Sequence, residues 1–170
     1  GLDGISGAKL REQQFKASQI IPNSSLVCTN DLVYPYEFSQ IHPTQKCEVG
    51  ERLAYTALNR DYGFEGLLYK SPSYKDMTIK EDAAYIHLQD NYHTDAPFED
   101  IEGFEIAGED KVFHPATAQH FGQEGGGYWD EAIKISSPEV KKPVAVRYCF
   151  KNFQLGNVKN AGGLPLFPFR

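Results

Sequence analysis

The 170-residue sequence is poor in sulfur-containing residues and tryptophan, with three Cys, one Met and one Trp. Cys28, Cys47 and Cys149 are widely spaced and include no CxxC pair, the spacing typical of zinc sites and thiol redox centres. Their odd number leaves at least one thiol free. We therefore expect no metal and no other cofactor.

Long apolar runs and excess positive charge are also absent. No window reaches the roughly 18 apolar residues of a membrane span, and no charged start followed by an apolar stretch indicates a signal peptide. The net charge of -6 argues against a nucleic-acid or anionic-membrane partner, because phosphate groups demand clustered Lys and Arg. A neutral or weakly charged ligand fits better.

Aromatic residues, in contrast, are abundant. The chain has ten Tyr and eleven Phe, and 41% of its residues are hydrophobic. This composition favours strands and carbohydrate-facing surfaces, and it is sufficient for the core of one domain or of two small ones.

The first third of the chain has the pattern of an α/β protein. Good helix formers predict a helix over Lys9–Ser18, and residues 25–29 (SLVCT) have the pattern of a short buried strand. Thr44 is a plausible N-cap for a second helix that reaches about Arg60, and Gly63 is a natural C-terminal stop. Because one strand cannot make a sheet, residues 1–62 read as a piece of a larger α/β domain.

Beyond residue 63 the sequence changes to short runs with alternating apolar residues, separated by Gly, Pro, Asp and Asn. This pattern predicts an antiparallel β-sandwich over residues 63–170, with a loop tip at residues 123–127 (QEGGG) and an extended tail, GGLPLFPFR. The predicted strands lie in the runs AAYIHL, GFEIAG, AIKISS and VAVRYCF.

His42 stands in a His-Pro turn directly ahead of the second predicted helix. A catalytic histidine must reach a nucleophile and an orienting group, and a loop held by rigid elements meets that requirement. A histidine in such a turn is more often a capping or solvated residue, so spacing alone leaves both roles open.

The residues themselves supply no convincing nucleophile. The segment GISGA around Ser6 is superficially similar to the G-x-S-x-G elbow, but its last glycine is replaced by Ala8 and no strand precedes it. Cys47 and Cys28 both have the pattern of small packing residues, which is the usual role of a buried thiol.

Two further groups of side chains are candidates for ligand binding. The first group consists of acidic and histidine side chains, which are metal-ligand types, but their spacing matches no known metal-ligand signature. A solvated acidic loop is therefore the better interpretation. The second group has aromatic faces that stack on sugar rings, although most large aromatics belong to cores. The metal-type residues are Glu99, Asp100, Glu102, Glu109, Asp110, His114 and His120, and the aromatic residues are Tyr92, Phe98, Tyr128 and Trp129.

Six blocks of the sequence carry a family resemblance. In order they are GAKLREQQFKAS, IPNSSLVCTNDL, IHPTQKCEVGERLAYTAL, GFEIAGEDKVFHPA, PVAVRYCFKNF and GLPLFPFR. They resemble the C-terminal part of sialate O-acetylesterases, carbohydrate esterases of the SGNH hydrolase superfamily, and are most similar to versions from Bacteroides-type gut bacteria. The likeness covers nearly the whole chain.

The resemblance implies a fold and a chemistry. Residues 1–62 would be the end of a three-layer α/β SGNH hydrolase domain, and residues 63–170 a C-terminal antiparallel β-sandwich domain. In this family a serine attacks an acetyl ester on a sugar, and the histidine of an I-H-P segment takes the serine proton. His42 matches that histidine.

The family's nucleophile lies in a block resembling G-Q-S-N, which this sequence does not contain. The triad acid, which often stands two or three residues before the histidine, is replaced by Gln40 and Ser39, while Glu37 and Asp31 lie at other spacings. We therefore interpret the chain as the C-terminal part of a longer esterase, inactive alone. Such a piece should expose apolar surface where the rest of the sheet would pack, around Leu26, Val27 and Leu53.

Two alternatives stay open. The chain can be a non-catalytic carbohydrate-binding or scaffolding β-sandwich, or one subunit of a split enzyme whose serine lies on a second chain. For the esterase, the expected partners are an O-acetylated sugar as substrate and an upstream segment or second chain, with no nucleic acid and no membrane. The resemblance also implies an exported protein, periplasmic or secreted.

Overall fold

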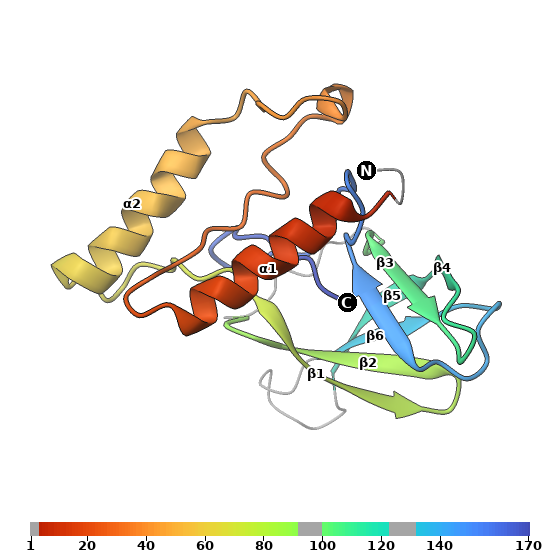
Figure 1. The fold of residues 1–170 in the computed structure, drawn as a ribbon. Coiled ribbons are helices and arrows are strands. Elements are labelled where there is room, and N and C mark those ends of the chain that lie inside the picture. The colour runs from red at the N-terminus through yellow and green to blue at the C-terminus, as the bar shows by residue number, and fades with distance from the viewer. Residues whose placement is uncertain (1–3, 92–99, 123–131) are drawn as a thin grey trace.

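The computed structural model describes residues 4–91, 100–122 and 132–170. Two α-helices precede two antiparallel sheets, and α2 lies at the edge of the molecule, away from the strands (Figure 1). The elements are α1 (Ser6–Ile20), the short 3-10 helix η1 (Pro35–Glu37), α2 (Cys47–Tyr62), β1 (Ser73–Lys80), β2 (Ala83–Gln89), β3 (Phe104–Ala107), β4 (Phe113–Pro115), β5 (Thr117–Phe121), β6 (Ala132–Ser136) and β7 (Ala145–Tyr148).

Both predicted helices are confirmed, although their bounds differ from the predicted ones. The first helix extends the predicted range at both ends. The second begins at Cys47, so the prediction that Thr44 caps it is wrong: Lys46 occupies the N-cap, and the Thr44 N–H instead donates to the Glu37 carboxylate. Its end agrees with the prediction, because Gly63 adopts the left-handed conformation with φ 76°. Within the described ranges no helix is both long enough and apolar enough to cross a membrane.

The strands beyond residue 63 form two antiparallel sheets, as predicted. One sheet has the order β1-β2-β6-β5, and the other has the order β4-β3-β7. The sequence pattern indicated β2, β3, β6 and β7 but missed β1, β4 and β5. β1 is an edge strand whose side chains are almost all exposed, so it lacks the alternation of a half-buried strand.

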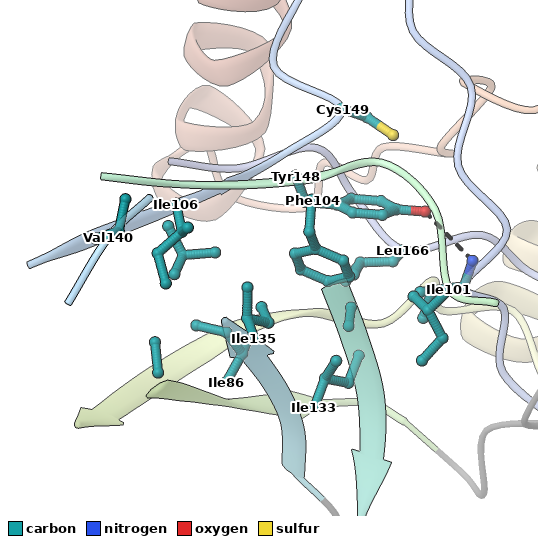
Figure 2. Close-up of a cluster of buried hydrophobic side chains, with 14 residues drawn as sticks. Ile86, Ile101, Phe104, Ile106, Ile133, Ile135, Val140, Tyr148, Cys149 and Leu166 are labelled. Carbon is teal, nitrogen blue, oxygen red and sulfur yellow. Dashed lines mark hydrogen bonds between the residues drawn. The ribbon is translucent and has the colours of Figure 1, made fainter. Parts of the chain in front are cut away.

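The core lies between the two sheets. Figure 2 shows Ile86, Ile133 and Ile135 of the four-stranded sheet facing Phe104 and Ile106 of the three-stranded sheet. All five side chains are buried in one hydrophobic cluster. This packing is the main apolar burial of the molecule.

The tail is extended, as predicted, and closes this core. Phe169 and Tyr148 exchange two backbone hydrogen bonds, and Leu166 is buried in the core cluster. The Tyr148 hydroxyl accepts a hydrogen bond from the Val158 N–H at 3.3 Å, drawn as a dashed line in Figure 2. The predicted loop tip at residues 123–127 lies outside the described residues.

The prediction of a strand at residues 25–29 is wrong, because these residues belong to neither sheet. The backbone there is not part of a helix or strand, because no described strand lies beside it to form a ladder. The other helical element of the first third, α1, packs on the far end of the chain: the Gly7 N–H donates to Asn152 Oδ1 at 2.8 Å, and the rings of Phe15 and Phe167 are 5.0 Å apart. The division into domains 1–62 and 63–170 stays a prediction.

One glycine reports on the tightness of this packing. A methyl group on Gly156 would collide with the Tyr148 hydroxyl and with Cys149 Sγ, whereas one on Gly50 of α2 meets nothing within 4 Å. We expect Gly156→Ala to lower the free energy of unfolding by about 1–3 kcal/mol through overpacking. Gly50→Ala should raise it by about 0.5–1 kcal/mol, because glycine is unfavourable inside a helix. Urea unfolding measures both, and equal effects of the two variants would contradict the packing.

Candidate active site

His42 lies in the connection between the two helices, on a loop that one buried carboxylate closes. Glu37 is 3% exposed. Its Oε2 accepts the backbone N–H of Tyr34 at 2.8 Å, and its Oε1 accepts the backbone N–H of Thr44 at 3.0 Å. We call residues 34–44 the His42 loop. Both ends of this loop are therefore tied to a single side chain.

The two backbone bonds also set the charge of that side chain. The Tyr34 N–H, together with the Thr44 N–H, holds the pKa of Glu37 below its usual range despite the opposing effect of burial. Glu37 is consequently ionised at neutral pH, and its hydrogen bonds are of the strong, charge-assisted kind.

A second carboxylate anchors the start of the same connection to α2. Asp31 makes a bidentate pair with the Arg52 guanidinium, with both N···O distances 2.8 Å, and Lys159 Nζ lies 3.2 Å from its Oδ2. Arg52 also donates to the Cys28 carbonyl. Burial raises the pKa of Asp31, but the hydrogen bonds and charge of Arg52, with those of Lys159, outweigh it and leave the pKa below its usual range.

His42 itself is exposed, and within the described ranges no hydrogen-bond or ion-pair partner orients its ring. Both nearby carboxylates are committed elsewhere, Glu37 to backbone N–H groups and Asp31 to Arg52 and Lys159. The loop therefore presents the imidazole to the outside, and the described residues provide neither its acid nor its nucleophile. The catalytic role of His42 stays a prediction.

Two of the three cysteines are buried and one is exposed, whereas the sequence predicted that both Cys28 and Cys47 are packing residues. Cys28 and Cys149 are buried, and burial raises the pKa of each thiol to about 12. Neither is a thiolate at neutral pH, so neither is a nucleophile. Cys47 is exposed, so its interpretation as a packing residue is wrong: it is the first residue of α2. Ser6 begins α1, and among the described residues no strand precedes it.

The other candidates form no site in the part of the chain that the structure describes. His114 pairs with Glu139, and the described residues contain no group of three or more His, Cys, Asp or Glu that could hold a metal ion. A cavity of about 350 Å³ lies beside the C-terminal part of α2, where Arg60 and Lys70 are among its lining residues, and His42 is not. The aromatic candidates Tyr92, Phe98, Tyr128 and Trp129, together with Glu99, lie outside the described residues.

Large apolar side chains are exposed around His42 and along α2. Ile41, next to His42, is 85% exposed, and Phe38 is 69% exposed. Leu53 of α2 is 53% exposed, as the sequence predicted, while Leu26 and Val27 are half-buried.

Comparison with known proteins places the chain in a functional context. No protein-family model matches it, and no curated protein matches it. Among solved structures it is similar to a carbohydrate acetylesterase from Xanthomonas citri, with a TM-score of 0.79 and 33% sequence identity over 95% of this chain.

The chain is thus related to a carbohydrate esterase. It spans 35% of the length of that solved chain. The likeness does not extend to sialic acid or to a Bacteroides-type source, and the SGNH assignment stays a prediction.

Sequence reasoning missed the roles of Glu37 and Arg52. For Glu37 a local signal existed, because a proline at the first helical position with a glutamate two residues later is typical of a helix start that the glutamate closes. For Arg52 no local signal existed. An arginine inside an amphipathic helix is ordinarily solvated, whereas Arg52 is buried against Asp31 and the Cys28 carbonyl, which are distant in sequence.

The buried pair yields a stability prediction. We expect Asp31→Asn to lower the free energy of unfolding at pH 7 by on the order of 3 kcal/mol, because Arg52 loses its charged partner while it stays buried. The exposed Asp61 on α2 is the matched control, and Asp61→Asn should change stability by less than about 0.5 kcal/mol.

The same pair predicts the direction of a pH effect. The pKa of Asp31 is depressed in the folded state, so its stabilisation is fully present above the unfolded pKa of about 4 and is lost as the pH falls through the folded pKa. The stability gap between wild type and Asp31→Asn should therefore be constant from pH 7 to 5 and shrink below pH ~4. Urea unfolding at each pH measures it, and a gap that widens on acidification would refute the assignment.

Glu37 yields a local prediction. In Glu37→Gln the amide can accept only one of the two backbone bonds as well as the carboxylate does, so we expect the amides of Tyr34 and Thr44 to exchange hydrogen roughly ten-fold faster. The sheets should be unaffected. NMR-detected exchange measures this, with Glu51→Gln on the exposed side of α2 as control. Unchanged exchange of both amides would show that Glu37 does not hold the loop.

Proposed function

We propose that this chain is the C-terminal part of a carbohydrate O-acetylesterase that removes acetyl esters from sialic acid or a related sugar. The observation that carries the proposal is the similarity to the Xanthomonas citri carbohydrate acetylesterase over 95% of the chain. His42, on its braced and exposed loop, is the general base, and the serine nucleophile belongs to a part of the enzyme outside these residues.

The chemistry follows from the properties of an exposed imidazole. His42 takes the serine proton as the serine oxygen attacks the acetyl carbonyl, and the protonated ring then gives that proton to the departing sugar oxygen. Water, activated by the same ring, hydrolyses the acetyl-serine and releases acetate. Glu37 contributes by holding the loop, because a catalytic base displaced by about 1 Å loses much of its effect.

The proposal includes partners and a location. The substrate is an O-acetylated sugar, the partner is the segment or second chain that carries the serine, and the protein is periplasmic or secreted. The similarity supports the first of these, and the exposed apolar residues beside His42 support the second.

Two observations favour a second function. Within the described ranges His42 has no orienting partner, and the cavity of about 350 Å³ does not include it among its lining residues. A non-catalytic sugar-binding or scaffolding module would show both features, and in such a module His42 would be dispensable.

The two functions separate in a single assay. We expect this chain alone to be inert toward an aryl acetate, and a chimera in which it replaces the matching part of the Xanthomonas citri enzyme to hydrolyse it. His42→Ala should then lower kcat about 10²–10⁴-fold, the usual contribution of a general base. His114→Ala, which removes a histidine on the three-stranded sheet, is the control and should have little effect.

Two results would count against the proposal. Turnover by the chain alone that requires His42 would mean that a nucleophile lies inside these residues. An active chimera that tolerates His42→Ala would favour the non-catalytic module.

A further inference from the structure

The cavity of about 350 Å³ lies at the end of α2 that is remote from His42. An α-helix rises by about 1.5 Å per residue, so Arg60, which lines the cavity, lies roughly 20 Å along α2 from Cys47. The cavity walls come from α1, residues 24–26, the C-terminal half of α2, residues 69–73, the end of β2 and the tail. Its volume is at the lower end of the roughly 300–1,000 Å³ range of ligand pockets, so it suits a molecule of one ring.

The cavity wall offers hydrogen-bonding groups. Just over half of the lining residues are serine, threonine or glutamine. Among them Ser73 is satisfied, because its hydroxyl accepts a hydrogen bond from Gln89 Nε2 at 2.9 Å. Ser71 is only 8% exposed, and its hydroxyl has no hydrogen-bond partner among the described residues. Buried hydroxyls are ordinarily paired, so Ser71 leaves a hydrogen-bonding position for a molecule in the cavity.

The charges at the cavity favour an anion. Arg60 donates through Nη1 to the Ser24 carbonyl and to Ser25 Oγ, both at 2.7 Å, while its Nη2 has no acceptor in the described ranges. Lys70 Nζ lies 3.6 Å from Oδ1 of Asp90, the acidic residue among the described lining residues. The lining thus carries one net positive charge in a chain of net charge -6. A guanidinium whose position is already fixed matches the planar geometry of a carboxylate.

Aromatic side chains complete the lining. The rings of Phe15 and Phe167, 5.0 Å apart, form an apolar wall, and the half-buried Tyr69 adds a third ring. Aromatic rings provide large, rigid apolar surfaces, and small-molecule pockets combine such surfaces with a few placed polar groups. Aromatic surface beside several hydroxyls and amides is the chemistry that binds a sugar ring.

We propose that this cavity is a binding site for a monosaccharide that carries a carboxylate. The carboxylate pairs with Arg60 and Lys70, a sugar hydroxyl pairs with Ser71, and the ring packs against Tyr69. Because the site lies at the other end of α2 from the His42 loop, it binds sugar without taking part in ester hydrolysis. The inference therefore does not rest on the proposed function and holds whether or not His42 is catalytic.

The test is a titration followed by amide NMR spectra of this chain. The probes are two sugar acids, D-glucuronate and N-acetylneuraminate, with D-glucose and acetate for comparison. We expect at least one sugar acid to shift the amide signals of residues 69–71 saturably. D-glucose lacks the carboxylate and acetate lacks the ring, so each should bind at least ten-fold more weakly than that sugar acid.

Two variants and two matched controls locate the site. Lys70→Gln should weaken binding of the sugar acid about ten-fold, because it removes one of the two cations. Ser71→Ala should weaken it about two- to ten-fold, as loss of one hydrogen bond predicts. Lys75→Gln, on the exposed side of β1, and Ser137→Ala, at a buried serine outside the cavity, should leave binding unchanged. Unshifted signals from the two sheets show that each variant is folded.

Three results would overturn the proposal. The first is no saturable shift at residues 69–71 with either sugar acid, and the second is binding of D-glucose or acetate as tight as that of the sugar acids. The third is binding by this chain but not by the Xanthomonas citri chimera, because the rest of the enzyme would then fill the cavity. Ester hydrolysis is not measured here, so a failure of the proposed function stays distinguishable from a failure of this site.

Discussion

The bidentate pair between Asp31 and Arg52 joins the parts of the molecule on which a function of His42 depends. Arg52 comes from α2, Asp31 from the start of the loop connection, and Lys159 from the segment that leads to the tail. The same guanidinium donates a hydrogen bond to the Cys28 carbonyl, in the extended segment that precedes Asp31. A charge buried to this degree requires its partners, so these segments keep their relative positions or the pair is lost.

The His42 loop depends on this arrangement and adds its own constraint. Glu37 closes the loop by accepting two backbone N–H groups, and in the described structure it makes no hydrogen bond with His42. The carboxylates near His42 in sequence are thus structural. Their charges hold the loop and its anchor, and the imidazole stays exposed.

The exposed groups gather in one part of the chain. The first third of the chain holds the exposed apolar side chains beside His42 and exposed residues of α2. It also holds residues 25–29, whose backbone N–H groups make no hydrogen bond within the described ranges. The sheets, by contrast, bury a shared core and are closed by the tail. The similar carbohydrate acetylesterase is much longer, since this chain spans 35% of its length.

Local patterns in the sequence determined the two helices, the Gly63 stop, four strands and the extended tail, because helix periodicity, strand alternation and turn residues act over a few positions. Only the tertiary structure decided whether residues 25–29 have a sheet partner, since pairing needs a neighbour that no local pattern supplies. It also decided that Glu37 is buried and that Cys47 is exposed. Burial depends on which distant segments pack together, and the sequence around a residue does not contain that information.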